Sequence, residues 1–256
     1  MPATLPSLDP ALQRCAKKET TGLEQIYRQI APSIKALALH VLNDEALARQ
    51  ALHDSMVMVW QHASHFNPVH GPAYAWIFSI FRYRLQALQR QTTPDESERI
   101  IAAQHWLDNI SPCLDHFEPP LRAHLNEQNA QCIVLAYCRG LNSADIASVL
   151  NIDAPEILTD LTTTFNRTPT VPQSGSQAGQ ALIALYVLGL LDPNQAGAAQ
   201  SAIAEDDNAL KQALYWEGLF FRLTQILPVI DPDEQTWEKI QKTLQLTIIP
   251  QPLKTD

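Results

Sequence analysis

Apolar residues recur every three or four positions along most of this chain, which is the spacing of an amphipathic helix. Residues 23–42 show it first, because apolar positions from Leu23 through Ile30 to Val41 fall on one face. No stretch alternates apolar and polar residues as a half-buried strand does. The pattern therefore predicts an all-α fold, with helices over residues 23–42, 45–62, 73–91, 98–110, 112–117, 121–139, 143–150, 154–165, 180–190, 193–204, 208–227 and 232–246.

Cap and stop residues mark the ends of several predicted helices. Gly140 is expected to end one helix, and Ser143 to cap the next. Asp192 and Asp231 are each followed by proline, and this pair suits a helix start because Asp caps free amides and proline fits the first turn. Glu234 follows Asp231 by three residues, as in a capping box.

Polar stretches divide the chain into modules. Residues 92–98 and 167–179 are rich in polar residues and contain prolines, which is typical of linkers. Between residues 143 and 165, two short helices joined by a three-residue turn predict a helix-turn-helix. The predicted organisation is a loose leader over residues 1–18, a first module over 19–95, a linker with connecting helices over 96–118, the helix-turn-helix module over 119–167, a linker over 168–179, a third module over 180–246 and a tail over 247–256.

Composition and charge favour helices and protein partners. The chain has only 8 glycines, which argues against a hairpin-rich fold. Its net charge is −9, and acidic residues outnumber basic ones both before and after Arg167. An acidic protein has no strong unaided attraction to a phosphate backbone. The surface is therefore better suited to protein partners.

The four cysteines have no paired spacing, so we expect buried, reduced thiols. The N-terminus lacks the pattern of a signal peptide. The longest apolar run, residues 181–191, is shorter than the roughly 20 residues that span a bilayer. The sequence thus predicts a cytoplasmic protein without a membrane segment.

Two groups of motifs carry a resemblance to a known family. The first comprises residues 47–60, then Phe66-Asn67-Pro68, Gly71 and Ala75-Trp76; the second is residues 133–150. They resemble regions 2 and 4 of extracytoplasmic-function sigma factors of the sigma-70 family, in the order and spacing of that family. The resemblance implies a regulator of transcription initiation that binds the RNA polymerase core and promoter DNA.

A third resemblance lies near the C-terminus. Residues 186–192, Trp216, residues 227–229 and residues 237–240 resemble the cytosolic domain of an anti-sigma-K-type factor. That domain normally silences a sigma factor. The resemblance implies an intramolecular contact, for which the apolar candidates are Leu185, Leu188, Leu214 and Phe221. One alternative is that these residues contact an external partner, and another is that they form the core of a self-contained bundle.

The sequence departs from the sigma-factor pattern at the polymerase and promoter surfaces. The resemblance places RNA polymerase binding at Gln50, His53 and Asp54, where the acidic and glutamine pattern of the family is only partly kept. The helix-turn-helix has Ser143, Ile146, Leu150, Ile157 and Leu161 at its scaffold positions.

The second helix of that motif, residues 154–165, contains Glu156 and Asp160 but no Lys or Arg. Because recognition of duplex DNA needs cations for the phosphates, we favour a protein contact for this helix. Promoter binding through it is therefore expected to be weak or lost.

Region 2 retains a candidate DNA surface. Basic residues interleaved with aromatics suit unstacked single-stranded bases. The candidates are Tyr74, Trp76, Arg82, Tyr83, Arg84 and Arg90. The alternative is that Trp76 belongs to the core and that the arginines are solvated.

We find no pattern for a catalytic site, a cofactor or a metal. His62, His65 and His70 gather near one helix end, but they lack a fourth ligand and a defined spacing, so they are expected to be surface residues. Two hypotheses for function remain. The chain is either a sigma factor restrained by a fused anti-sigma domain, or a degenerate sigma that binds other proteins and no longer binds promoters.

Overall fold

The computed structural model describes residues 7–91, 96–169 and 177–245. Within these ranges every regular element is helical, so the all-α prediction is confirmed. The α-helices are α1 (Asp9–Ala16), α2 (Thr20–Leu42), α3 (Glu45–His62), α4 (Ala73–Gln89), α5 (Glu96–Ile110), α6 (Pro119–Arg122), α7 (Glu127–Arg139), α8 (Ser143–Leu150), α9 (Ala154–Arg167), α10 (Gln177–Leu188), α11 (Pro193–Glu205), α12 (Asp207–Phe221) and α13 (Glu234–Thr243). Three 3-10 helices join them: η1 (Ala63–His65), η2 (Cys113–His116) and η3 (Arg222–Ile226).

The N-terminal module, residues 7–91, packs α2, α3 and α4 together with α1. Residues 9–16 were expected to belong to a loose leader, and this is wrong: Leu12 and Cys15 are fully buried against α2. Gly22 explains the close approach, because a Cβ at that position would overlap the carbonyl oxygen of Ala11. The rest of the predicted leader, residues 1–6, lies outside the described residues.

The middle module, residues 96–169, contains the predicted helix-turn-helix as α8 and α9. Some boundaries and caps differ from the prediction, and the predicted helix over residues 112–117 is the 3-10 helix η2. Residues 121–139 are divided between α6 and α7, because the Asn126 side chain caps α7 by accepting from the Asn129 amide at 2.7 Å. Asn142, and not Ser143, caps α8 in a capping box with Asp145.

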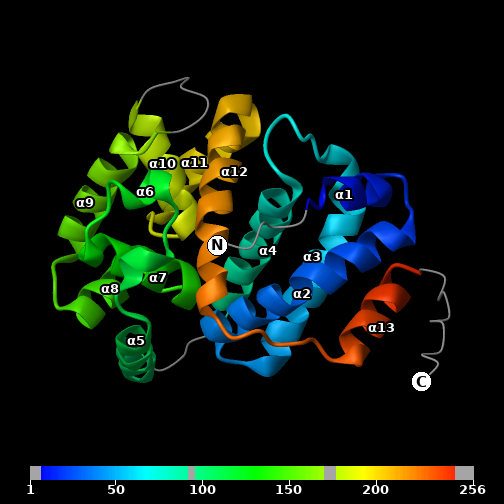
Figure 1. Ribbon diagram of the computed structural model, residues 1–256, viewed down its shortest axis with the longest axis horizontal. Helices are drawn as coiled ribbons and strands as arrows, with labels where there is room; N and C mark the ends of the chain where they lie inside the picture. Colours follow the sequence, from blue (N-terminus) through cyan, green and yellow to red (C-terminus); the bar gives the residue numbers. More distant parts are fainter. Residues whose placement is uncertain (1–6, 92–95, 170–176, 246–256) are drawn as a thin grey trace.

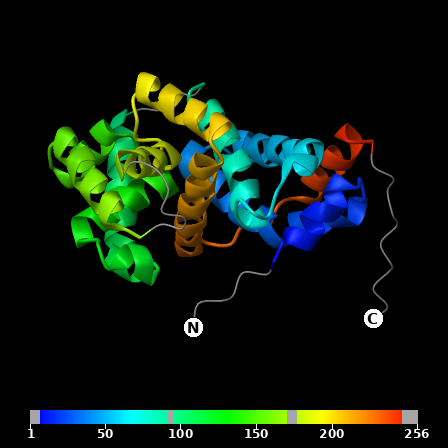
Figure 2. The same ribbon diagram turned by 90° about the horizontal axis from the view of Figure 1, so that it is seen from above.

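The C-terminal module, residues 177–245, is not a self-contained bundle. In Figure 1, α12 stands between the helices α5–α9 on one side and α1–α4 on the other. Helix α10 packs on α9, α12 packs on α4, and α13 packs on α3. Figure 2 shows α13 beside the N-terminal helices, at the end remote from the middle module. The module therefore contacts both other modules.

The helix starts in this module follow local capping chemistry. Asp192 caps α11 as predicted, accepting from the amides of Asn194 and Gln195. Helix α13 is capped by Asp233 and not by Asp231, because the Asp233 carboxylate accepts from the Thr236 amide at 2.8 Å. The predicted helix over residues 208–227 is α12 followed by the tighter η3.

Candidate partner-binding surfaces and the module junction

Two of the three predicted polymerase-binding residues on α3, Gln50 and His53, lie beside the C-terminal helix α13. The Nε2 atom of His53 lies 3.0 Å from the hydroxyl of Thr243, and Arg49 lies 3.5 Å from the carboxylate of Asp233. Gln50 lines the cleft between the two helices, which has a volume of about 420 Å³. Asp54 instead forms an ion pair with Arg84 of α4, with an N–O distance of 2.6 Å. This face of α3 is thus partly covered by the chain's own C-terminal module.

Of the predicted DNA-binding residues on α4, Arg82 is the clearest departure. Its side chain is only 7% exposed, and it donates a hydrogen bond to the backbone oxygen of Val187 in α10. Arg82 is therefore neither a solvated arginine nor available to DNA in this arrangement.

The other candidates on α4 are divided among different environments. Tyr83 is exposed, and Arg90 is exposed just beyond the end of the helix. The Tyr74 ring lies 5.5 Å from the ring of Phe221. The half-buried Trp76 packs beside Phe66, with ring centroids 5.9 Å apart. The six residues therefore do not form one continuous exposed surface.

A buried polar cluster joins all three modules at Arg82. Its Nε lies 3.6 Å from Oε2 of Glu217 in α12, and its guanidinium stands 4.3 Å from the centre of the Tyr137 ring in α7. The Tyr137 hydroxyl donates to Oε1 of Glu217 at 2.7 Å. Each polar group therefore has a partner from another module.

The electrostatics of this cluster depend on its burial. Burial raises the pKa of the Glu217 carboxyl to about 7, while the Arg82 charge and the Tyr137 hydrogen bond act to lower it. Burial also raises the pKa of Tyr137 well above its ordinary value, and the neighbouring Glu217 carboxylate adds to this effect. The sequence analysis missed Glu217 and Tyr137. The available signal was a single carboxylate inside the aromatic run of residues 215–221.

Apolar contacts surround this cluster. The rings of Phe78 in α4 and Phe221 in α12 are 4.1 Å apart. Leu214 packs so closely on Gly71 that a Cβ there would lie 2.9 Å from the Leu214 Cβ. Leu185 and Leu188 are also buried. The four residues predicted at an inter-module contact are therefore all buried, with Leu214 and Phe221 directly against the N-terminal module.

The helix-turn-helix has a buried scaffold and an acidic outer surface. Ile146, Ile157 and Leu161 are buried, whereas Ser143 and Leu150 are half-buried. The exposed residues of α9 include Glu156, and its one cation is Arg167, the last residue of the helix.

Other candidate chemistry is sparse in the described part of the chain. His62 and His65 lie together, but His70 turns to Asp207, and no group of residues there could hold a metal ion. All four cysteines are free and buried. Among the described helices, none combines the length and apolarity that crossing a membrane requires.

The N-terminal module is similar to a known family. Residues 26–93, which include most of α2 and all of α3 and α4, match the family of sigma-70 region 2 domains. The N-terminal module thus has the features of a sigma-70 region 2.

Over 143 residues the chain is 25% identical to the ECF RNA polymerase sigma factor SigL of Mycobacterium tuberculosis, covering 54% of this chain and 81% of that protein. It is 23% identical over 153 residues to the ECF RNA polymerase sigma factor SigK of Mycobacterium bovis, covering 55% and 80%. Both relatives are named as ECF RNA polymerase sigma factors, and the chain is similar to them over about half of its length.

Proposed function

We propose that this chain is a sigma-factor-like regulator of transcription initiation that is restrained by its own C-terminal module. The observation that carries the proposal is the position of α13 on the face of α3 that includes Gln50 and His53. If this face binds the RNA polymerase core, the same surface cannot bind α13 and polymerase together. Release of α13 is then a condition for polymerase binding.

The buried cluster supports restraint at a second point. Glu217 and the Val187 carbonyl hold Arg82, one of the candidate DNA-binding residues of α4. Exposing Arg82 requires separation of α4 from α10 and α12. Promoter melting and the closed arrangement are therefore mutually exclusive in this proposal.

Tethering makes such a restraint effective even when each contact is weak. Because the three modules belong to one chain, the effective concentration of the C-terminal module near α3 is on the order of millimolar. A polymerase surface must outcompete that concentration, or a further signal must weaken the contact first.

The test uses the intact chain with substitutions on α13. Trp237 packs on Tyr27 with ring centroids 4.7 Å apart, and Ile240 is fully buried. Trp237→Ala with Ile240→Ala should release α13 and raise the affinity for RNA polymerase core by about tenfold, measured by biolayer interferometry. Glu238→Ala is the matched control, because Glu238 is exposed on the same helix. Equal affinity of all three proteins would contradict the proposal.

One observation favours the second candidate function, a degenerate sigma that sequesters proteins. Helix α9 presents carboxylates where a promoter-reading helix needs cations. Titration of the released variant with promoter-like duplex DNA at several salt concentrations separates the two functions. A steep salt dependence supports a working sigma factor, whereas absence of binding with retained polymerase affinity supports sequestration.

A further inference from the structure

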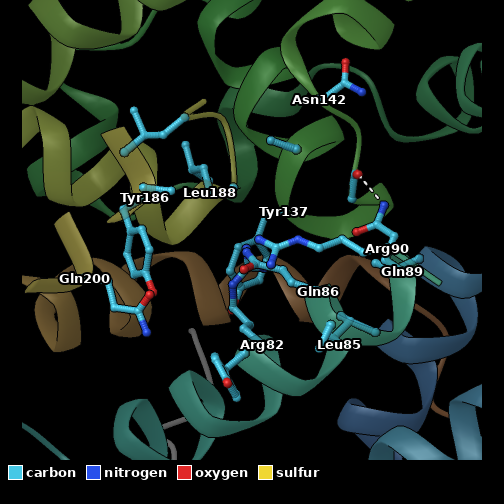
Figure 3. A pocket seen from close by; sticks show the side chains of 18 of the residues that line it. Arg82, Leu85, Gln86, Gln89, Arg90, Tyr137, Asn142, Tyr186, Leu188 and Gln200 are labelled. Atoms are coloured by element: carbon cyan, nitrogen blue, oxygen red, sulfur yellow. Dashed lines mark hydrogen bonds between the residues drawn. The ribbon is translucent and has the colours of Figure 1, made fainter. Parts of the chain in front are cut away.

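A cavity of about 310 Å³ lies where the three modules meet. Its walls come from α4 and α5, from α7 and the turn that follows it, and from α10 and α11, with Val41 of α2. Figure 3 shows Tyr186 and Gln200 on one side of this space and Gln89 and Arg90 on the other, with the Arg90 side chain extending inward. Its volume is within the range of small-molecule sites in proteins.

The lining of the cavity has an unusual charge for this chain. Arg82, Arg90 and Arg99 all line it, and its lining includes no Asp or Glu. The whole chain carries 27 acidic against 18 basic residues, so an arginine-rich wall is not an effect of composition. Glu217 and Asp145 pair with Arg82 and Arg99 from outside the lining. Arg90 makes no ion pair among the described residues and carries the free positive charge of the cavity.

A second observation also indicates an anionic ligand. The Nε atom of Arg99 is buried and has no hydrogen-bond acceptor within the described structure. Buried donors are normally satisfied, so an unpaired one indicates a missing acceptor. Phosphate oxygens are well matched acceptors for guanidinium groups.

The remaining lining suits a planar ring. Tyr83 and Tyr186 line the cavity together with the side-chain amides of Gln86 and Gln200. Burial raises the pKa of Tyr186, the nearby Tyr83 raises it further, and Arg90 lowers it, so both tyrosines and the cation are neighbours. Tyrosine faces bind nucleobases by stacking, and amides can bond to base edges.

Two glycines keep the walls of the cavity close together. Gly189 has a φ of 75°, and a Cβ there would lie 3.1 Å from the amide nitrogen of Gln86. Gly140 has a φ of 64°, and its carbonyl accepts from Gln89 at 2.7 Å. These left-handed positions, which favour glycine, bring the C-terminal and middle modules against α4. The cavity therefore depends on the closed arrangement of all three modules.

We propose that this cavity binds a mononucleotide, with its phosphate near Arg90 and Arg99 and its base between the tyrosines and the amides. Such a ligand contacts all three modules, so it binds the closed form and not the open one. A ligand that binds one of two forms shifts the equilibrium toward the form that it binds. If the proposed function holds, the ligand therefore opposes polymerase binding; this step rests on that function.

Binding is tested on the intact chain without polymerase, so its failure is distinct from failure of the proposed function. Isothermal titration with AMP should show saturable binding, while adenosine and inorganic phosphate each bind at least about tenfold more weakly. Arg90→Ala should weaken AMP binding by about tenfold or more, since it removes a charge-assisted contact. Arg28→Ala is the matched control, because Arg28 is an exposed arginine of α2 that does not line the cavity.

Three results would overturn the proposal. The first is that AMP gives neither heat of binding nor a rise in melting temperature. The second is that Arg90→Ala binds AMP as tightly as the wild type does. The third is that inorganic phosphate binds as tightly as AMP. Because Arg90 is exposed beyond the end of α4, its substitution should leave the circular dichroism spectrum unchanged. A Tyr186→Ala variant provides a second measurement, and it should lose AMP affinity while retaining any weak phosphate binding.

Discussion

At the scale of single residues, Arg82 and Glu217 show how burial changes the role of a charge. An arginine beside tyrosines in α4 resembles a nucleic-acid contact in the sequence, yet in the fold it lies under α10 and α12. Removing two charges from water is costly, and the cost is recovered only when both are hydrogen-bonded. The Val187 carbonyl and Tyr137 complete that requirement here.

Breaking this pair should be strongly destabilising. Arg82→Met leaves Glu217 buried without its cation, and loss of one partner of a buried pair typically costs about 3–5 kcal/mol. Arg122→Ala removes a pair with Asp115 that is largely exposed, so it should cost less than about 1 kcal/mol. Urea unfolding followed by circular dichroism measures both, and similar values for the two variants would contradict the importance of the cluster.

Glu217 should also make the stability depend on pH. Its pKa in the folded protein is about 7, above its ordinary value of 4.5, so between these values the folded chain binds more protons than the unfolded one. The stabilising contribution is complete below pH 4.5 and is lost as the pH rises through about 7.

The Glu217→Gln variant lacks this titration. Its free energy of unfolding should therefore rise relative to that of the wild type between about pH 5 and 7. Comparing the two proteins cancels His40, whose pKa is lowered by burial and by Arg139, and which contributes the opposite slope. A difference that does not change with pH would show that Glu217 does not titrate in this range.

At the scale of elements, α9 and α13 each combine a buried face with a charged surface. Helix α9 keeps the buried positions of a helix-turn-helix while its surface lacks a cation before Arg167. Helix α13 buries Ile240 and Thr236 and directs Lys239 and Lys242 to the cleft beside α3. In each helix, therefore, the residues that pack in the core differ from the residues that set the surface charge.

Charge reversal on α9 tests this separation. Glu156→Lys with Asp160→Arg should increase the affinity for duplex DNA and steepen its salt dependence by about two phosphate contacts. Fluorescence anisotropy at several salt concentrations gives both quantities.

Because Arg82 is buried, Arg84→Ala with Arg90→Ala should remove any residual binding of the native chain. Tight DNA binding that survives the double alanine change would show that another surface reads the DNA.

At the scale of the whole molecule, the C-terminal module packs against both other modules. Helix α12 contributes Phe221 to the N-terminal module, while Trp216 and Phe220 pack on Phe165 of the middle module. The C-terminal module therefore stabilises one relative position of the others. Opening of the junction should expose groups that are now buried.

Cys138 reports on that opening. Its thiol lies 3.7 Å from the Leu223 carbonyl at the junction, and burial raises its pKa to about 12, so it should react slowly with a thiol reagent. Phe221→Ala should weaken the junction and accelerate the labelling of Cys138, followed by mass spectrometry. Cys15, which is buried between α1 and α2, is the internal control. Equal acceleration at both cysteines would indicate general unfolding instead of opening of the junction.

The sequence alone was sufficient to predict the helical fold class and most of the helices, because apolar periodicity and capping residues act within a few positions of each other. Where the predicted start of a helix was wrong, a different side chain provided the cap: Asn126 caps α7 and Asn142 caps α8. The sequence also supplied the resemblance to sigma region 2. The predicted roles in polymerase and DNA binding stay predictions.

Which charges are exposed and which are buried follows from the tertiary packing and not from local sequence. Arg82 and Glu217 are 135 positions apart, and no local pattern relates them. Contacts between distant segments also produce three other features: the packing of Leu12 against α2, the packing of α13 on α3, and the arginine-lined cavity. Such contacts follow from the burial of apolar faces against each other, and a one-dimensional pattern shows each face but not its partner.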